Sequence, residues 1–381
     1  MKAGWQVKLL GELSELITDG THNSPDYVEA GIPMLDSKHV KDGFLIDDTE
    51  PEKFISSATD LILSKRCKPQ AGDILISSRG SIGKIAIVKE GQDFNIMGNM
   101  ILIRLPETIN RYFTTYYLHS KVSHIESISR GVAQKGLYLN QIREYELPLP
   151  PLPEQQRIVS ILDEAFEGIA TATANAKKNL ANARELFESY LQSIFANGCR
   201  GWEFRTLNQI AENLDNKRVP ITKNVRSSGA YPYYGASGIV DYIGEYIFDD
   251  DLLLVSEDGA NLLARTYPIA FSISGKTWVN NHAHVLRFKN MVSQKLVEFY
   301  LNSILLDNYI SGMAQPKLNQ KMLNTIPVPF PPFAEQQTIV TKLDELSAET
   351  KKLEAIYIQK LTLLEELKKS ILNQAFSGQL N

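Results

Sequence analysis

The 381-residue chain has few cysteines, no long apolar run and no excess of positive charge. Its two cysteines, Cys67 and Cys199, are too few and too far apart to suggest a disulfide framework or a zinc site. No apolar run approaches the ~20 residues that a membrane span needs, and the first residues lack the apolar stretch of a signal peptide. We therefore expect a cytoplasmic protein.

The charge balance and the missing motifs exclude further classes. The chain has 40 Lys and Arg against 44 Asp and Glu, a net charge of −4, whereas nucleic-acid binding usually requires a basic excess. Any DNA contact would therefore use a local basic patch or the charge of a partner subunit. The chain also lacks the Asn/Asp-Pro-Pro-Tyr/Phe motif of amino-methyltransferases and the G-x-S-x-G elbow of hydrolases. We expect no active site in this chain.

The prolines are concentrated in two related strings. LPLPPLPEQQ occupies residues 147–156 and VPFPPFAEQQ occupies residues 328–337, an offset of 181, in a chain with only 17 prolines. Alternating prolines favour an extended polyproline II path, which would make a stiff connector. Pro153 and Glu154 suit a helix start. A PxxP ligand for an SH3-type groove is the alternative, but both strings run directly into a predicted helix.

Other short motifs also occur twice, and together with the proline strings they divide the chain into segments. Gly-Trp opens the chain at residues 4–5 and recurs at 201–202. Gly-x-Ala-Gln recurs at 131–134 and 312–315, and Leu-Asn-Gln at 139–141 and 318–320. We predict four segments: a globular domain (1–146), a connector and helix (147–200), a second globular domain (201–327), and a second connector and helix (328–381).

Each connector precedes a long heptad pattern. Apolar residues follow steps of four and three, with one additional step of four between Ala176 and Leu180 and the same irregularity between Tyr357 and Leu361. Matching irregularities indicate that the two helices pack against each other. A pseudo-two-fold repeat makes them antiparallel, in an intramolecular coiled coil that separates the two domains. Predicted seam residues are Leu162, Ile169, Ala176, Leu180, Phe187, Ile194, Leu343, Leu353, Tyr357, Leu361, Leu364 and Ile371.

Both globular domains alternate strand-like runs with turn signals. Residues 72–77, 84–88 and 100–104 in the first domain correspond to 251–255, 267–271 and 284–288 in the second, and helical stretches at 111–120 and 294–306 follow them. We predict an α/β (α+β) fold with a curled β-sheet in each domain.

Polar loops supply the candidate binding residues. The loop at 78–84 resembles a phosphate loop but lacks its glycine and its Ser/Thr. It is therefore either a tight turn or a loop that offers side chains to phosphates or guanine edges. The polar side chains of Asn-Asn-His-Ala-His at 280–284 could either contact DNA bases or form a buried hydrogen-bond network, and the sequence favours neither. We expect no metal there, because a metal site needs more ligands. The candidates, including those beside the repeated motifs and in the tyrosine cluster at 231–234, are Ser78, Arg79, Ser81, Lys84, Arg130, Gln134, Lys135, Asn140, Tyr233, Asn280, Asn281, His282, Gln315, Lys317 and Asn319.

Together, the Gly-Trp openings, Gly-x-Ala-Gln, the Glu-Gln-Gln connectors and the doubled long helix closely resemble the specificity subunit of type I restriction-modification systems. The resemblance implies two target recognition domains that read a bipartite, asymmetric double-stranded DNA target. It implies two methyltransferase subunits and two restriction (motor-nuclease) subunits as partners, with S-adenosylmethionine, ATP and Mg²⁺ in those partners and no cofactor in this chain. The alternatives are a subunit with hidden nuclease activity and a coiled-coil scaffold without DNA specificity.

Overall fold

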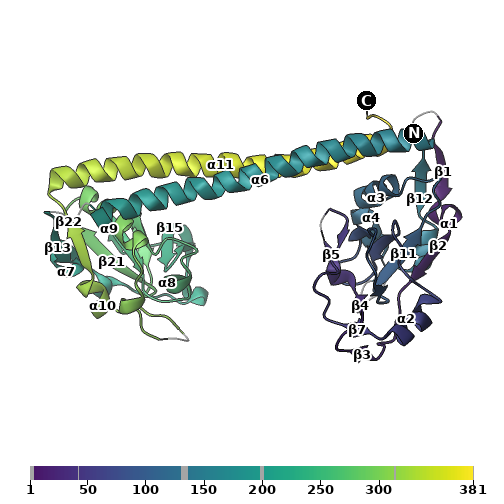
Figure 1. Cartoon of the computed structure of the whole chain (residues 1–381). Coiled ribbons are helices and arrows are strands. Elements are labelled where there is room, and N and C mark those ends of the chain that lie inside the picture. Colours follow the sequence, from purple (N-terminus) through teal and green to yellow (C-terminus); the bar gives the residue numbers. More distant parts are fainter. Residues whose placement is uncertain (1–3, 42, 130–135, 198–200, 313–314, 381) are drawn as a thin grey trace. The chain divides into compact units, whose positions relative to one another are not determined.

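The chain divides into two compact units, each with its own core (Figure 1). The computed structural model describes residues 4–41, 43–129, 136–197, 201–312 and 315–380. Unit 1 comprises residues 1–175 and 360–381, and unit 2 comprises residues 176–359. Two long helices contribute to both units: α6 (Leu152–Asn197) begins in unit 1, and α11 (Phe333–Ser377) begins in unit 2.

Unit 1 contains two four-stranded sheets. One has the antiparallel order β2-β11-β8-β9, and the other has the order β10-β4-β7-β3 with a parallel β4–β10 pair. Its elements before α6 are β1 (Gln6–Leu9), α1 (Leu10–Leu13), β2 (Leu16–Asp19), β3 (Tyr27–Val28), β4 (Ile32–Leu35), β5 (Val40–Lys41), β6 (Leu45–Ile46), β7 (Phe54–Ile55), α2 (Ser57–Ser64), β8 (Ile74–Ser77), β9 (Ile85–Ile87), β10 (Asn95–Ile96), β11 (Met100–Arg104), α3 (Arg111–Ser120), α4 (Val122–Ile128), α5 (Leu139–Arg143) and β12 (Glu146–Leu149).

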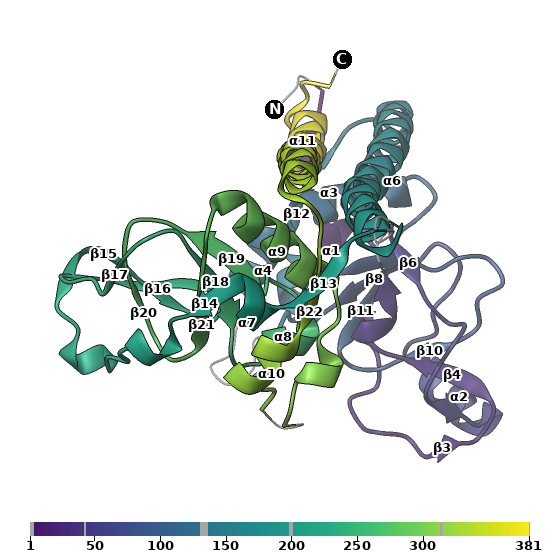
Figure 2. The same ribbon diagram turned by 90° about the vertical axis from the view of Figure 1, so that its left-hand side faces the viewer.

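Unit 2 repeats this plan. Its first sheet has the order β14-β21-β18-β19, which matches the first sheet of unit 1 strand for strand, and α9 lies beside it (Figure 2). A second sheet has the order β16-β15-β20-β17, with β15 and β20 parallel. The elements are β13 (Glu203–Thr206), α7 (Leu207–Ile210), β14 (Ala211–Asn213), β15 (Ser228–Gly235), β16 (Gly238–Ile243), β17 (Phe248–Asp249), β18 (Leu252–Ser256), α8 (Asn261–Ala264), β19 (Ala270–Ile273), β20 (Lys276–Val279), β21 (Ala283–Phe288), α9 (Met291–Ser303), α10 (Gln320–Thr325) and β22 (Pro327–Phe330).

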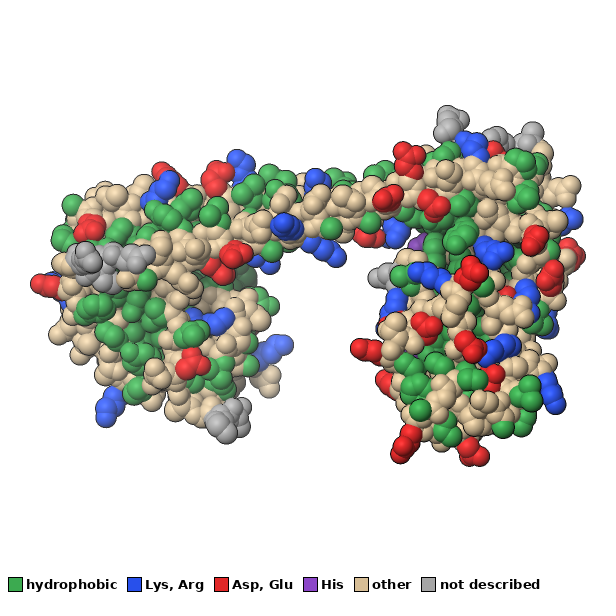
Figure 3. Space-filling model, viewed as in Figure 1, with side chains coloured by type: hydrophobic (Ala, Val, Ile, Leu, Met, Phe, Trp, Pro, Cys, Tyr) green, Lys and Arg blue, Asp and Glu red, His purple; other side chains and the backbone are tan. Residues whose placement is uncertain are grey.

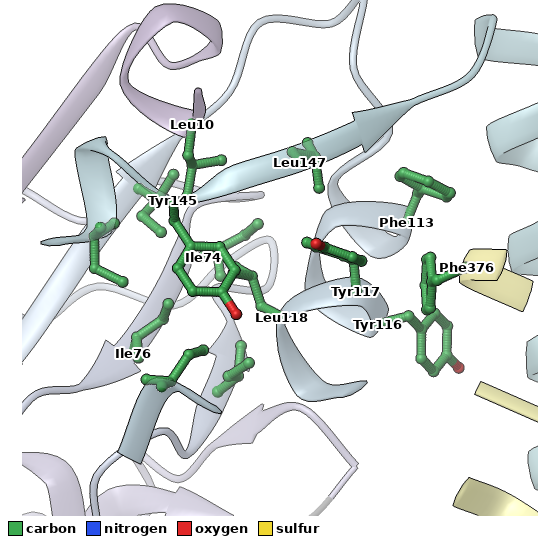
Figure 4. Close-up of a cluster of buried hydrophobic side chains, with 14 of the residues drawn as sticks. Leu10, Ile74, Ile76, Phe113, Tyr116, Tyr117, Leu118, Tyr145, Leu147 and Phe376 are labelled. Atoms are coloured by element: carbon green, nitrogen blue, oxygen red, sulfur yellow. The ribbon is translucent and has the colours of Figure 1, made fainter. Parts of the chain in front are cut away.

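The core of unit 1 joins its sheet to both long helices. The central strands β8 and β11 are buried on both faces, and α3 lies between the sheet and the helices (Figure 1). Phe376 of α11 points toward the aromatic side chains of α3 (Figure 4), with ring centroids 5.4 Å from Phe113 and 5.2 Å from Tyr117. The last turns of α11 are therefore part of this core, although they are more than 200 residues from α3 in the sequence.

The first three residues of each proline string lie in a β-strand and the last five lie in the long helix that follows, so the polyproline II prediction is wrong for these residues. Strand β12 pairs antiparallel with β1, and β22 pairs antiparallel with β13. Successive N–H groups of a strand point to opposite sides, so prolines at alternate positions leave the bonds to one neighbouring strand intact. Each two-stranded ribbon joins the start of a repeat to its connector. The predicted helix start is confirmed, since α6 begins at Leu152, one residue before Pro153.

The first glutamine of each Glu-Gln-Gln anchors the connector to its unit. Gln155 is buried, accepts the Asn110 N–H at 2.8 Å through Oε1, and donates to the Pro150 carbonyl at 2.8 Å. Gln336 does the same in unit 2, with a 2.8 Å bond to the Pro331 carbonyl and another from the Ser293 hydroxyl. This explains why the motif is repeated.

The antiparallel pairing of the two long helices is confirmed within each unit. In unit 1, Leu162 near the start of α6 shares a buried cluster with Ala375 near the end of α11. In unit 2, Phe195 near the end of α6 shares a cluster with Leu343 near the start of α11, and Arg184 pairs with Glu354 at 2.7 Å.

The predicted seam residues differ in burial. Leu162, Ala176 and Leu343 are almost fully buried, whereas Leu353 is 40% exposed and lies at the margin of the helix pair. The remaining seam residues are buried or half-buried: Ile169, Leu180, Phe187, Ile194, Tyr357, Leu361, Leu364 and Ile371. Near the end of α6, Leu191 is buried against α9 residues, so the contact face there differs from the heptad pattern.

Candidate nucleic-acid interface

Three loops meet beside the central strand of each unit, and the same backbone hydrogen bonds hold them. In unit 1, the Ser78 N–H donates to the Asn99 carbonyl at 2.8 Å, and the Leu137 N–H donates to the Ser78 carbonyl at 2.9 Å. In unit 2, the Glu257 N–H donates to the His282 carbonyl at 2.9 Å, and the Leu318 N–H donates to the Glu257 carbonyl at 2.8 Å. We name residues 78–84, 97–99 and 136–140 loop site 1, and residues 257–261, 280–282 and 315–319 loop site 2.

Loop site 1 gathers several of the residues predicted from the sequence. Arg79 and Asn140 are exposed and line one cavity of about 390 Å³ together with Tyr138 and His22. A second cavity of about 200 Å³ shares Arg79 and His22 and is also lined by Lys38 and Asn99. Four of these lining residues were not predicted from the sequence, because their proximity depends on the pairing of distant segments: His22, Lys38, Asn99 and Tyr138.

The hairpin loop between β8 and β9 presents its polar residues unequally. Ser81 and Lys84 are exposed, and the Lys84 N–H donates to the Ser77 hydroxyl at 2.9 Å, which shapes the loop. Ser78 is only 3% exposed and its backbone bonds the two neighbouring loops. The prediction that the Ser78 side chain contacts DNA is therefore not supported. Arg130, Gln134 and Lys135 lie outside the described residues.

Loop site 2 surrounds a larger cavity, of about 720 Å³, lined by Tyr233, Asn280, Asn281 and His282. Asn281 is exposed, and the His282 side chain is 50% exposed with its Nδ1 2.9 Å from an Asp258 carboxylate oxygen. Asn280 is buried and its Oδ1 accepts the His282 N–H at 2.8 Å, so it braces the turn.

Tyr233 does not offer an open face to a base. It is 1% exposed, its hydroxyl accepts the Ile221 N–H at 3.1 Å, and the Arg226 guanidinium lies over its ring at 4.3 Å. The structure therefore gives Tyr233 a packing role beneath the cavity, and the prediction that its ring contacts DNA is not supported.

Side chains of the segment 315–319 contact both the neighbouring loop and helix α10. Gln315 is exposed, and Lys317 reaches Glu257 at 3.1 Å. The Asn319 side chain caps α10 by accepting the Met322 N–H at 3.0 Å, which is a structural role. Gly312 has φ +83 and a side chain there would meet the Gln315 carbonyl, so this position requires glycine.

His284 belongs to a buried network rather than to the cavity. Its Nδ1 lies 2.6 Å from Asp215 and its Nε2 lies 2.7 Å from the Leu318 carbonyl, while Arg218 pairs with Glu257 at 2.6 Å. This resolves the open question about the Asn-Asn-His-Ala-His string: His282 faces the cavity and His284 is structural.

The two carboxylates of this network remain charged. Burial by itself would raise the pKa of Asp215, but the bonds from His284 and the Val285 N–H, with the nearby Arg218, hold that pKa below its ordinary range. Burial likewise opposes ionisation of Glu257, whose pKa is nevertheless lowered by Arg218, His284 and Lys317. Cations therefore fix the loops that border loop site 2.

The wider surface carries charges of both signs. Lys/Arg and Asp/Glu side chains alternate on the face of unit 1 seen in Figure 3. Lys38, for example, is paired with Glu52. The described residues contain no group of three or more His, Cys, Asp or Glu side chains that could hold a metal ion. Among the helices within the described ranges, none is long and apolar enough to cross a membrane.

These features define an internally duplicated α/β binding protein, in which one loop frame appears twice with different polar side chains. A family model described as the type I restriction modification DNA specificity domain matches residues 2–182 and 200–363. The chain belongs to this family, and DNA sequence recognition is its function. The family resemblance read from the sequence is thereby confirmed.

Individual relatives have the same description. A putative type I restriction enzyme specificity subunit from Haemophilus influenzae is 36% identical over 148 residues, which cover 39% of this chain and 38% of that protein. The putative type I restriction enzyme MjaX specificity subunit of Methanocaldococcus jannaschii is 26% identical over 416 residues. This match covers 99% of this chain and 93% of that protein.

Solved structures share the fold. A chain from a structural study of complex assembly and conformational transition in a type I R-M system matches with a TM-score of 0.79 and 19% identity, covering 100% of this chain and 99% of the other. The HsdS subunit from Thermoanaerobacter tengcongensis matches with a TM-score of 0.61 and 19% identity, covering 100% and 98%. The predicted fold class, with its internal repeat, is confirmed.

Proposed function

We propose that each unit binds one component of a bipartite, asymmetric DNA target through its loop site. The observation that carries this proposal is the repeated frame: the same backbone bonds hold three loops in each unit, but the side chains on them differ. A shared frame with different polar groups is what two unlike DNA sequences require, because the pattern of donors and acceptors in the major groove differs for each base pair.

The charge of the chain suggests that it binds DNA tightly only as part of a complex. Most DNA affinity comes from neutralising phosphates, and this chain has a net charge of −4. Base-reading side chains can still supply specificity, since phosphate contacts and base contacts are separate functions.

The partners in this proposal are two methyltransferase subunits and two restriction (motor-nuclease) subunits. Apolar side chains on the long helices are available for docking: Leu186 and Ile356 in unit 2 are 71% and 49% exposed, and Leu363 in unit 1 is 53% exposed. The chain directs adenine methylation and restriction without catalysing either. S-adenosylmethionine, ATP and Mg²⁺ are bound by the partners.

The test is to combine the purified chain with the methyltransferase subunit encoded beside it, add S-adenosylmethionine and map methylated adenines in genomic DNA. We expect methylation within one bipartite sequence, and none when the chain is omitted. Methylation without sequence preference would favour a scaffold, and cleavage of a labelled duplex by the chain and Mg²⁺ alone would reveal a nuclease.

A further inference from the structure

Arg79 and Asp258 occupy equivalent positions in the two loop sites. Each lies two residues after the end of the central strand, which ends at Ser77 in unit 1 and at Ser256 in unit 2. Each also forms an isolated antiparallel bridge, Arg79 with Gly136 and Asp258 with Lys317. Gly136 and Lys317 are 181 residues apart, the offset of the proline strings. The repeat thus places opposite charges at one position of the frame.

The environment of Arg79 leaves its guanidinium available to a ligand. Arg79 is exposed and lines both cavities of loop site 1. Among the described residues it has no ion-pair partner, and Gly136, opposite it, has no side chain to cover it. A guanidinium presents paired donors that match the O6 and N7 acceptors of guanine.

The environment of Asp258 favours the opposite polarity. Lys317 is the residue opposite Asp258, but its ammonium pairs with Glu257, so the carboxylate of Asp258 is bonded to His282 instead. His282 Nδ1 lies 2.9 and 3.0 Å from the two carboxylate oxygens. A carboxylate can only accept, so Nδ1 carries the proton toward Asp258, and in its neutral form the ring then presents Nε2 as an acceptor. Both groups therefore match bases that present an amino group, adenine through N6 or cytosine through N4.

We infer that Arg79 and the Asp258–His282 pair are specificity determinants of opposite polarity, the first reading a guanine in one target component and the second reading an adenine or cytosine amino group in the other. This inference rests on the proposed function and goes beyond it, because it assigns a base class to a residue in each unit.

The test is to map the methylated sequence for variants of the full chain assembled with its methyltransferase subunit. For Arg79→Ala we expect the preference for one guanine to fall by about 5- to 150-fold, the range of one good bidentate contact, while the other component is unchanged. Asp258→Asn and His282→Ala should each relax one adenine or cytosine position, in the component that Arg79→Ala leaves intact. Arg79→Lys retains the charge without the paired donors and should relax the same guanine.

Lys89→Ala and Asp251→Asn are the matched controls, since both residues are exposed and lie outside the loop sites. Both controls should leave the methylated sequence unchanged, and circular dichroism verifies that each variant is folded. An unchanged sequence in Arg79→Ala or in Asp258→Asn would overturn the inference, as would a uniform loss of methylation without a change in sequence. If the unsubstituted complex methylates no bipartite sequence, the proposed function fails first.

Discussion

The buried glutamines of the two Glu-Gln-Gln motifs offer a test of the fold with controls in the next residue. Gln155 and Gln336 are each 2% exposed and form two side-chain hydrogen bonds at 2.8 Å, whereas Gln156 and Gln337 are exposed. Gln155 and Gln156 are the same residue type and are neighbours in the same helix, and so are Gln336 and Gln337. Any difference between their alanine variants therefore reports the buried bonds.

The expected cost follows from the groups left without partners. Gln155→Ala removes the acceptor for the Asn110 N–H and the donor for the Pro150 carbonyl. An unsatisfied buried polar group costs about 1–3 kcal/mol, so we expect a loss of about 2–4 kcal/mol in the stability of unit 1. Gln156→Ala should change it by less than about 0.5 kcal/mol, as is usual for surface substitutions.

Hydrogen exchange read by mass spectrometry can locate the effect. In Gln155→Ala, amides of α3 should exchange about 30- to 800-fold faster, the factor that corresponds to this free-energy range, with no change in α9. Gln336→Ala should show the reverse. Equal exchange in Gln155→Ala and Gln156→Ala would refute the role assigned to the buried glutamine.

Three other changes have defined outcomes. Phe376→Ala should destabilise unit 1 by about 3–4 kcal/mol in urea unfolding, because a buried aromatic contact with α3 is lost; a change below about 1 kcal/mol would contradict the docking of α11. Since the pKa values of Asp215 and Glu257 are lowered by folding, their contribution is present above about pH 4–5, the range in which these groups ionise in unfolded chains, and is lost as pH falls through the folded values. The melting temperature of unit 2 should therefore fall in acid, less so in the Asp215→Asn/Glu257→Gln variant, and equal pH profiles would argue against the network. Replacing residues 201–326 with another domain of this family should change one component of the methylated sequence, whereas changes in both would show that the units do not read independently.

The sequence predicted the repeated frame because the frame depends on patterns along the chain. Strand β11 has the predicted bounds of 100–104, and α3 the predicted bounds of 111–120. The helix at 294–306 begins earlier than predicted, at Met291, because the Asn290 side chain caps it. Heptad spacing likewise predicted that the two long helices pack against each other, since apolar steps record the contact face directly, and the pseudo-two-fold repeat predicted their antiparallel direction.

The errors arose where tertiary pairing overrides a local pattern. The Leu-Asn-Gln motifs are 179 residues apart, but the helix caps Tyr138 and Asn319 are 181 apart, so the structure aligns Leu318 with Leu137 rather than with Leu139. The proline strings were assigned a polyproline II path because the partner strands, at the start of each repeat, are distant in sequence. Tyr233 was included as a candidate because composition alone does not show which ring is covered.

The separation of frame from chemistry gives a physical reason why one fold can serve two targets. All residues of β8 and β18 are buried, and all except the last serine of each strand are apolar, so a large-to-small substitution of these apolar residues costs about 2–5 kcal/mol. Two residues after each strand the chain reaches Arg79, which is exposed, and Asp258, which is half-buried, and substitutions at such positions outside the core usually cost much less, about 0.5 kcal/mol at the surface. Arg79 and Asp258 can therefore differ in charge while the backbone bonds around them stay the same. Specificity can change at these positions without loss of stability, provided that buried braces such as Ser78 and Asn280 are retained.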